Sequence, residues 1–97
     1  MTAPDFRAWI KFFPSSEGGR KGATPGTFFG CPLLFGDSLH DCRMLLGETG
    51  PIAPGDEKEV PIKMLNIDSV REFLREGVEF KVWDGRIVGT GKITKLK

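Results

Sequence analysis

The chain has 97 residues, 39% of them hydrophobic and 28% charged, with a formal net charge of +1. This length predicts one domain over residues 1–97 without room for a separate catalytic domain, and the composition excludes a disordered protein. The apolar runs are far shorter than the roughly 18 to 20 residues of a membrane span, and no secretion signal opens the sequence, so we expect a soluble cytoplasmic protein with no membrane contact.

The turn-forming residues, 13 glycines and 7 prolines without a repeat period, predict an all-β fold of short strands. Alternating residues predict a first strand from about Phe6 to Phe13, ending at Pro14. Trp9 and Phe13 fall on its polar face among basic residues. There they could stack on nucleic-acid bases or anchor a protein contact, although a covering loop is the simpler expectation in a small barrel.

Residues 14–26 are rich in glycine, serine and proline and predict a long polar loop. Backbone N–H groups and two cations within it could meet a phosphate; the residues concerned are Gly18, Gly19, Arg20, Lys21 and Gly22. The loop is not a P-loop, because the pattern G-x-x-x-x-G-K-[ST] occurs nowhere in the chain. Basic glycine loops are also common on surfaces without ligands, so the loop alone is a weak signal.

Two apolar runs predict a buried hairpin, residues 27–35 and residues 42–46. If Gly36 and Asp37 form a tight two-residue turn, Cys31 faces Cys42 across the strand pair. Together with His40 the cysteines would give three candidate metal ligands, but they lack the paired C-x-x-C spacing of zinc sites. We therefore expect buried free thiols and no metal.

A further strand contains Pro61, which predicts an edge position or an N–H side turned away from its neighbour. One short helix is predicted near residues 68–76. Asp68 or Ser69 could cap it, and Gly77 suits the left-handed position after its C-terminus. At about two turns, this helix needs support from the barrel and could plug one of its ends.

A last hairpin is predicted around Asp84-Gly85, a pair that tolerates the positive φ angles of a type I′ turn. Gly89 and Gly91 interrupt its second strand and predict a bend or a close backbone approach.

Charge is distributed unevenly along the chain. Basic residues outnumber acidic ones before residue 37 and after residue 80, and acidic residues outnumber basic ones between these positions. If the two end segments pair as strands, the domain should have a basic side and an acidic side, as suits contact with phosphates or an acidic protein. A dipolar surface without a partner explains the charges equally well.

Three blocks of the sequence resemble one family. Glu17–Arg20 with Thr24-Pro25 resembles an EGGR-x-TP loop, and Pro54-Gly55-Asp56 resembles an M-PGD segment. Residues 76–80 and 85–93 resemble the ending GLRFAIREGGRTVGAGVV. These blocks belong to the C-terminal β-barrel domain (domain 3) of translation elongation factor Tu. They occur here in the same order and with nearly the same spacing over almost the whole chain. The resemblance implies a six-stranded antiparallel β-barrel, with Gly89 and Gly91 as family glycines of the last strand.

In that family, the domain touches the acceptor and T-stem backbone of aminoacyl-tRNA, packs against the nucleotide-binding domain and meets the exchange factor. The resemblance thus implies a tRNA or partner site at Gly18, Gly19, Arg20, Lys21, Asp84, Gly85 and Arg86. Lys21 stands where the family commonly has histidine, and the Asp84-Gly85 turn is one residue shorter than its Glu-Gly-Gly. Cys31 and Leu33 stand where it has arginine and glutamine.

No P-loop or nucleotide-binding domain is present in this sequence, so we expect neither nucleotide binding nor GTPase activity, and no cofactor. The first functional hypothesis is a non-catalytic module that contacts the tRNA acceptor and T arm or a translation-factor protein. In it, Arg20, Lys21 and Arg86 face phosphates or carboxylates.

The alternative hypothesis is a protein-interaction regulator or domain mimic without RNA binding. Its candidate anchors are Trp9, Phe13 and Leu33, because interface energy concentrates in buried aromatic and large apolar side chains. An enzyme is not expected, since His40 is the only histidine and no paired-carboxylate or metal motif stands out. The pattern leaves the oligomeric state open.

Overall fold

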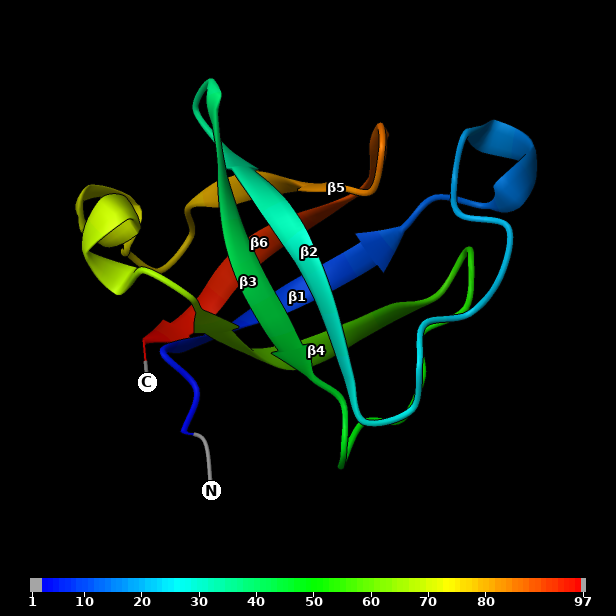
Figure 1. Ribbon diagram of the computed structural model, residues 1–97, viewed down its shortest axis with the longest axis horizontal. Helices are drawn as coiled ribbons and strands as arrows, with labels where there is room; N and C mark the ends of the chain where they lie inside the picture. The colour runs from blue at the N-terminus through cyan, green and yellow to red at the C-terminus, as the bar shows by residue number, and fades with distance from the viewer. Residues whose placement is uncertain (1–2, 97) are drawn as a thin grey trace.

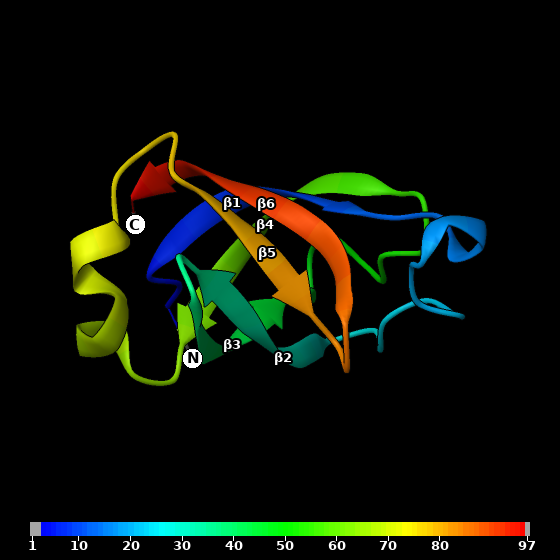
Figure 2. The ribbon, with the colours of Figure 1, turned by 90° about the horizontal axis from the view of Figure 1, so that it is seen from above.

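Six antiparallel strands form a closed barrel in the order β1-β4-β3-β2-β5-β6 (Figures 1 and 2). The structure, a computed structural model, describes residues 3–96. Its elements are β1 (Phe6–Phe12), η1 (Ser15–Glu17), β2 (Phe28–Phe35), β3 (Ser38–Leu45), β4 (Glu57–Met64), η2 (Ile67–Phe73), β5 (Glu79–Trp83) and β6 (Ile87–Leu96). The predicted all-β six-stranded antiparallel barrel is confirmed. None of the described helices is long and apolar enough to cross a membrane.

Strand alternation builds the core. In β1, the buried side chains are those of Phe6, Ala8, Ile10 and Phe12, and the residues between them are partly or fully exposed. Aromatic rings fill the middle of the barrel, where the ring centroids of Phe6 and Phe80 lie 6.2 Å apart and those of Phe35 and Phe80 lie 5.0 Å apart. Apolar burial at these inward positions is the main stabilising contribution to the fold.

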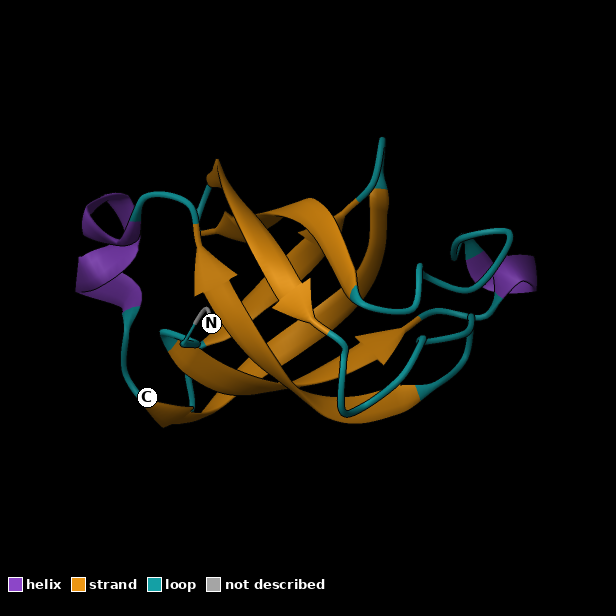
Figure 3. Ribbon diagram, turned by 60° about the horizontal axis from the view of Figure 1, so that its bottom comes forward, coloured by secondary structure: helices purple, strands orange, loops and turns teal. Residues whose placement is uncertain are grey.

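One end of the barrel is covered by η2, whereas η1 lies at the opposite end of the molecule (Figure 3). Val70 is fully buried, and the Phe73 ring stacks on Phe35 with centroids 5.4 Å apart. In a 3₁₀-helix, residues three apart eclipse one another, so Val70 and Phe73 reach the core from the same side. The expectation that the helix plugs an end of the barrel is confirmed.

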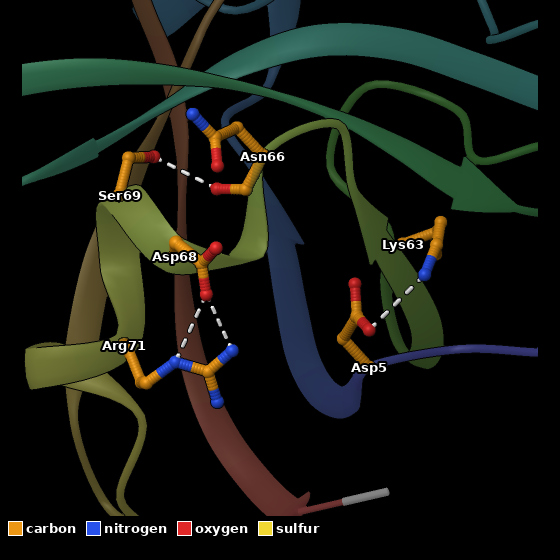
Figure 4. Close-up of polar contacts among 6 residues, drawn as sticks. All are labelled: Asp5, Lys63, Asn66, Asp68, Ser69 and Arg71. Atoms are coloured by element: carbon orange, nitrogen blue, oxygen red, sulfur yellow. Dashed lines mark hydrogen bonds and ion pairs between the residues drawn. The ribbon is translucent and has the colours of Figure 1, made fainter.

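The predicted cap of this helix is wrong, and the helix ends three residues before the predicted residue 76. The residue before it, Asn66, makes no capping side-chain hydrogen bond within residues 3–96. Ser69 instead donates its hydroxyl to the Asn66 carbonyl at 2.8 Å, and Asp68 pairs with Arg71 at 2.6 Å (Figure 4). Gly77 adopts φ 90°, the left-handed conformation that the sequence predicted.

Gly89 and Gly91 allow β6 to lie directly against its neighbours. A Cβ atom added at Gly89 would lie 2.5 Å from the Lys11 carbonyl oxygen, and one added at Gly91 would lie 2.3 Å from Phe80 Cζ. Both distances are shorter than van der Waals contact, so a side chain at either position would force its neighbour to move. The predicted close approach is confirmed.

The predicted basic side does not form as expected. β1 and β6 are neighbours, but β1 pairs on its other edge with β4, whose exposed residues include Glu57 and Glu59. Glu57 of β4 accepts a hydrogen bond from Trp9 Nε1 at 2.8 Å and lies 3.9 Å from Lys11 Nζ. Glu59 accepts a hydrogen bond from Thr94 Oγ1 at 2.9 Å. Acidic side chains therefore lie among the basic ones on this face.

Candidate functional site

The loop after η1 meets the β5–β6 hairpin, although the two segments lie more than 60 positions apart in the sequence (Figure 1). Arg20 Nε donates to Asp84 Oδ2 at 2.8 Å. Arg86 donates from Nε to the Gly18 carbonyl at 3.0 Å and from Nη2 to the Gly19 carbonyl at 2.8 Å. The two segments contain all seven predicted site residues, which we call the loop–hairpin cluster: Gly18, Gly19, Arg20, Lys21, Asp84, Gly85 and Arg86.

The two loop glycines are required by the protein's own packing. Gly18 ends η1 with φ 89°, a conformation that favours glycine. A Cβ added at Gly19 would lie 1.9 Å from the Phe13 carbonyl oxygen, and the Gly19 N–H donates to the Pro14 carbonyl at 3.0 Å. The glycines therefore explain how the loop folds back onto the end of β1, before any ligand is considered.

The hairpin presents Asp84 and Arg86 to this loop. Trp83 pairs with Ile87, so three residues connect the strands rather than the predicted two, and Gly85 at the tip has φ 75°. The register shifts beside this pair, which is the signature of a β-bulge. The extra residue changes the direction of the strand end, and both charged side chains contact the loop.

Arg20 is a packed cation rather than a freely mobile one. Its guanidinium lies 4.6 Å from the centroid of the Phe29 ring, its Nη1 donates to the Gly22 carbonyl at 3.1 Å, and its side chain is 20% exposed. A guanidinium carries five N–H groups. Arg20 and Arg86 each use two of them in these contacts, so each retains three N–H groups without a partner among residues 3–96.

A cleft of about 220 Å³ lies over the cluster, lined by Arg20, Lys21, Gly22, Asp84, Arg86 and Val88. Lys21 is exposed, and none of the salt bridges within the described residues involves it. Three cations and one carboxylate thus surround the cleft, and the carboxylate is paired with Arg20. Such an arrangement attracts a small anionic group, since charged N–H donors form the strongest hydrogen bonds to phosphate or carboxylate oxygens.

The three candidate apolar anchors lie in different environments. Trp9 is 45% exposed on the outer face of β1, whereas Phe13 is partly buried and its N–H donates to the Val88 carbonyl. Leu33 is completely buried, so its prediction as a surface anchor is wrong. The burial of Leu33 could not be predicted from the sequence, because Leu33 and Leu34 are both apolar. Only the pleat of β2 points the first inward and the second outward.

Cys31 and Cys42 lie opposite one another in the register of the β2–β3 hairpin, as predicted, and the two-residue Gly36-Asp37 turn is confirmed. The Sγ atoms of Cys31 and Cys42 lie 4.0 Å apart in the core, and both are free thiols. The hydrogen bond with Cys31 and burial raise the pKa of the Cys42 thiol, so it stays protonated at neutral pH. Reactive cysteines need the opposite shift, toward the thiolate.

The one histidine is engaged in structural contacts. His40 Nδ1 lies 3.1 Å from Ser69 Oγ, whose single proton is donated to the Asn66 carbonyl, so His40 Nδ1 must be the donor. His40 Nε2 lies 3.0 Å from Ser38 Oγ. Within residues 3–96, no three His, Cys, Asp or Glu side chains are grouped to hold a metal ion.

Sequence reasoning missed a second surface feature on the outer face of β2, β3 and β4. Two adjoining hollows of about 300 and 510 Å³ lie over β3, and a third of about 360 Å³ begins at its last residue, Leu45; we call the three together the outer groove. The two most exposed large apolar side chains among the described residues, Leu65 at 59% and Phe28 at 48%, line its central hollow. The available signal was the outward face of β2, where Phe28, Gly30 and Pro32 include no charged residue.

Neither a protein-family model nor a curated protein matches this sequence.

Proposed function

We propose that this chain is a non-catalytic binding module of the elongation factor Tu domain 3 type, which contacts the phosphate backbone of tRNA through the loop–hairpin cluster. The observation that carries the proposal is the contact between two of the resembling blocks. The EGGR-like loop and the final hairpin are joined by three hydrogen bonds from Arg20 and Arg86. A barrel of six antiparallel strands also agrees with the proposed kinship.

Preorganisation favours phosphate binding at this cluster. The two guanidinium groups are already held by the loop carbonyls and Asp84, so little side-chain freedom remains to be lost on binding. Their unused N–H groups suit the oxygens of a phosphodiester, and Lys21 adds a mobile charge at the rim. No bond is made or broken, and binding alone is the proposed activity.

The magnitude of the effect follows from the number of cations. Three cations that contact phosphates predict that log K falls with log salt at a slope of about −2 to −3. Binding should therefore be weak and confined to low ionic strength. Asp84 limits the attraction further, because its carboxylate partly neutralises Arg20.

The test measures the anisotropy of fluorescently labelled tRNA at increasing protein concentration and several salt concentrations. Lys21→Ala should weaken binding and reduce the salt slope by about one, because the residue is exposed and supports no internal contact. Arg75→Ala is the matched control, because Arg75 follows η2 at the other end of the barrel. Absence of binding at low salt, or equal loss in both variants, refutes the proposal.

The second candidate is the protein-interaction regulator or domain mimic without RNA binding. It is favoured by Trp9, whose indole is 45% exposed and held in place by the hydrogen bond to Glu57. A preorganised exposed aromatic is the kind of side chain that dominates protein interfaces. In the tRNA experiment, this candidate predicts no binding by the unmodified protein at any salt concentration.

A further inference from the structure

We propose that the outer groove is a separate docking site for an extended peptide segment that carries both acidic and large apolar side chains. This site lies on β2, β3 and β4, with Ala3, Pro4 and Arg7 bordering one end, and it shares no residue with the loop–hairpin cluster. It is therefore independent of the proposed tRNA contact.

One end of the groove lies where the pairing of β3 with β4 stops. Their register joins Cys42 to Met64, Arg43 to Lys63 and Met44 to Ile62. The register ends at Met44 and Ile62, and the next two residues, Leu45 and Pro61, line the hollow of about 360 Å³. Proline at this position lacks the N–H that would continue the ladder. At the other end, the Leu65 N–H still donates to the Asp41 carbonyl at 3.1 Å.

The central hollow has a defined chemical character. Its walls include three apolar side chains, those of Phe28, Leu45 and Leu65, and two cations, Arg43 and Lys63; Met64 also borders it, but its side chain is buried in the core. Among the described residues, the acidic ones of the outer groove line its flanking hollows, Asp41 the hollow of about 300 Å³ and Glu48 that of about 360 Å³, and none lines the central hollow. A partner's carboxylate is therefore expected in the central hollow. An apolar side chain of a partner could fill this space, and a carboxylate beside it would meet the cations.

The two cations differ in how far they are already neutralised. Lys63 Nζ lies 3.2 Å from Asp5 Oδ1 (Figure 4), so its charge is largely compensated. The Arg43 guanidinium instead lies 5.2 Å from the centroid of the Phe28 ring and belongs to no salt bridge within residues 3–96. Arg43 is therefore the residue expected to pair with the partner's carboxylate, while it holds the aromatic wall in place.

The shape of the groove favours an extended chain over a compact ligand. The hollow of about 300 Å³ shares Phe28, Arg43 and Leu65 with the central one, and the hollow of about 360 Å³ shares Leu45 with it. Gly30 has no side chain to fill the hollow of about 300 Å³, and a Cβ atom added there would come no closer than 3.9 Å to any other atom. In an extended peptide, alternate side chains point the same way, which would let successive apolar residues enter successive hollows.

The experiment titrates the full chain with a short labelled peptide of alternating aspartate and leucine or phenylalanine, followed by anisotropy and by amide chemical shifts in NMR spectra. The control peptide has lysine in place of every aspartate. We expect the acidic peptide to bind at least about tenfold more tightly than the basic one, with shifts concentrated at Phe28, Gly30, Arg43 and Leu65.

Two variants test the site itself. Gly30→Val fills the first hollow without crowding the protein and should weaken peptide binding about tenfold, while Gly22→Val, at an equally open glycine outside the groove, should not. Arg43→Ala should weaken the acidic peptide several-fold and leave the basic peptide unchanged. Unchanged secondary-structure spectra and unfolding midpoints would show that the variants are folded.

The proposal would be overturned by no binding up to about 1 mM peptide, by equal affinity for both peptides, by full affinity in Gly30→Val, or by shifts located elsewhere. Concentration-dependent dimerisation through this face would assign the groove to a second copy of the chain. That result would also overturn the proposal of a peptide ligand. Neither Lys21→Ala nor loss of tRNA binding should affect the peptide, so failure of one proposal is distinguishable from failure of the other.

Discussion

Replacing Gly91 by alanine should strongly destabilise the barrel. The new Cβ would lie 2.3 Å from Phe80 Cζ, 2.4 Å from Phe80 Cε1 and 3.0 Å from Ile10 Cδ1. Carbon atoms pack best at about 3.5–4.0 Å, so the Phe80 ring would have to move by more than 1 Å. It has little room to do so, because it is only 3% exposed and contacts the rings of Phe6 and Phe35.

The expected cost is about 3 kcal/mol. Overpacking a dense core typically costs about 1–3 kcal/mol, and displacing Phe80 also weakens two aromatic contacts worth about 0.5–1.5 kcal/mol each. We take the upper end of the first range because β1 holds the backbone of β6 in place. For a domain of this size, the melting temperature should fall by roughly 12–24 °C.

Urea unfolding followed by circular dichroism measures this cost, and Gly22→Ala is the matched control. A Cβ at Gly22 would meet no other atom within 4 Å, so that variant should be neutral or slightly stabilised. The double variant Gly91→Ala/Phe80→Leu should lose less stability than the sum of the two single variants, since the smaller side chain vacates the contested space. A loss below about 0.5 kcal/mol in Gly91→Ala, or strict additivity, would contradict the packing argument.

Three further predictions concern other parts of the molecule. Arg86→Ala should lower the free energy of unfolding by about 1–2 kcal/mol in urea titrations, because two loop carbonyls lose charged donors; an unchanged value would mean that the loop is held by other contacts. Gly30→Val should raise the free energy of unfolding by about 0.5–1 kcal/mol, since valine suits an open strand position better than glycine, and destabilisation would show that the position is crowded. The raised pKa of Cys42 predicts that stability is insensitive to this thiol below about pH 8.5 and falls above it, because the unfolded chain then releases a proton that the folded one retains. In pH titrations of stability, Cys42→Ala should remove this part of the alkaline loss, and an identical alkaline profile in both proteins would count against it.

The sequence predicted the features that depend on local pattern. Alternation located β1, the Gly36-Asp37 turn placed Cys31 opposite Cys42, and the spacing of glycines in β6 indicated a close approach. Each of these rests on neighbours in the chain or on a single turn, where backbone preference decides the geometry.

Features that depend on strand order were not predictable in this way. The pairing of β1 with β4 places Glu57 beside Lys11 and Trp9, and no local pattern specifies that neighbour. The outer groove likewise combines residues of β2, β3 and β4 that only the strand order brings together. Leu33 was misassigned because two consecutive leucines conceal which one points inward.

The loop–hairpin cluster is an intermediate case. The resemblance selected its residues, but it did not indicate that Arg20 and Arg86 hold the loop and the hairpin together. Their internal contacts explain these arginines without any ligand. The donors that remain unused are what the tRNA experiment tests.

The pairing of β1 with β6 also constrains when the chain can fold. Phe6 is in register with Leu96, and Phe12 with Gly89, so the last seam of the barrel joins segments separated by nearly the whole described sequence. Contacts of such long range form slowly, because the loop between them must be closed first. During synthesis, one edge of β1 can pair with β4, but its other edge has no partner strand until residues 87–96 have been made. A nascent chain halted before that point would expose an unpaired strand edge that can pair with other chains. Whether it folds or aggregates would then depend on what covers that edge until translation resumes.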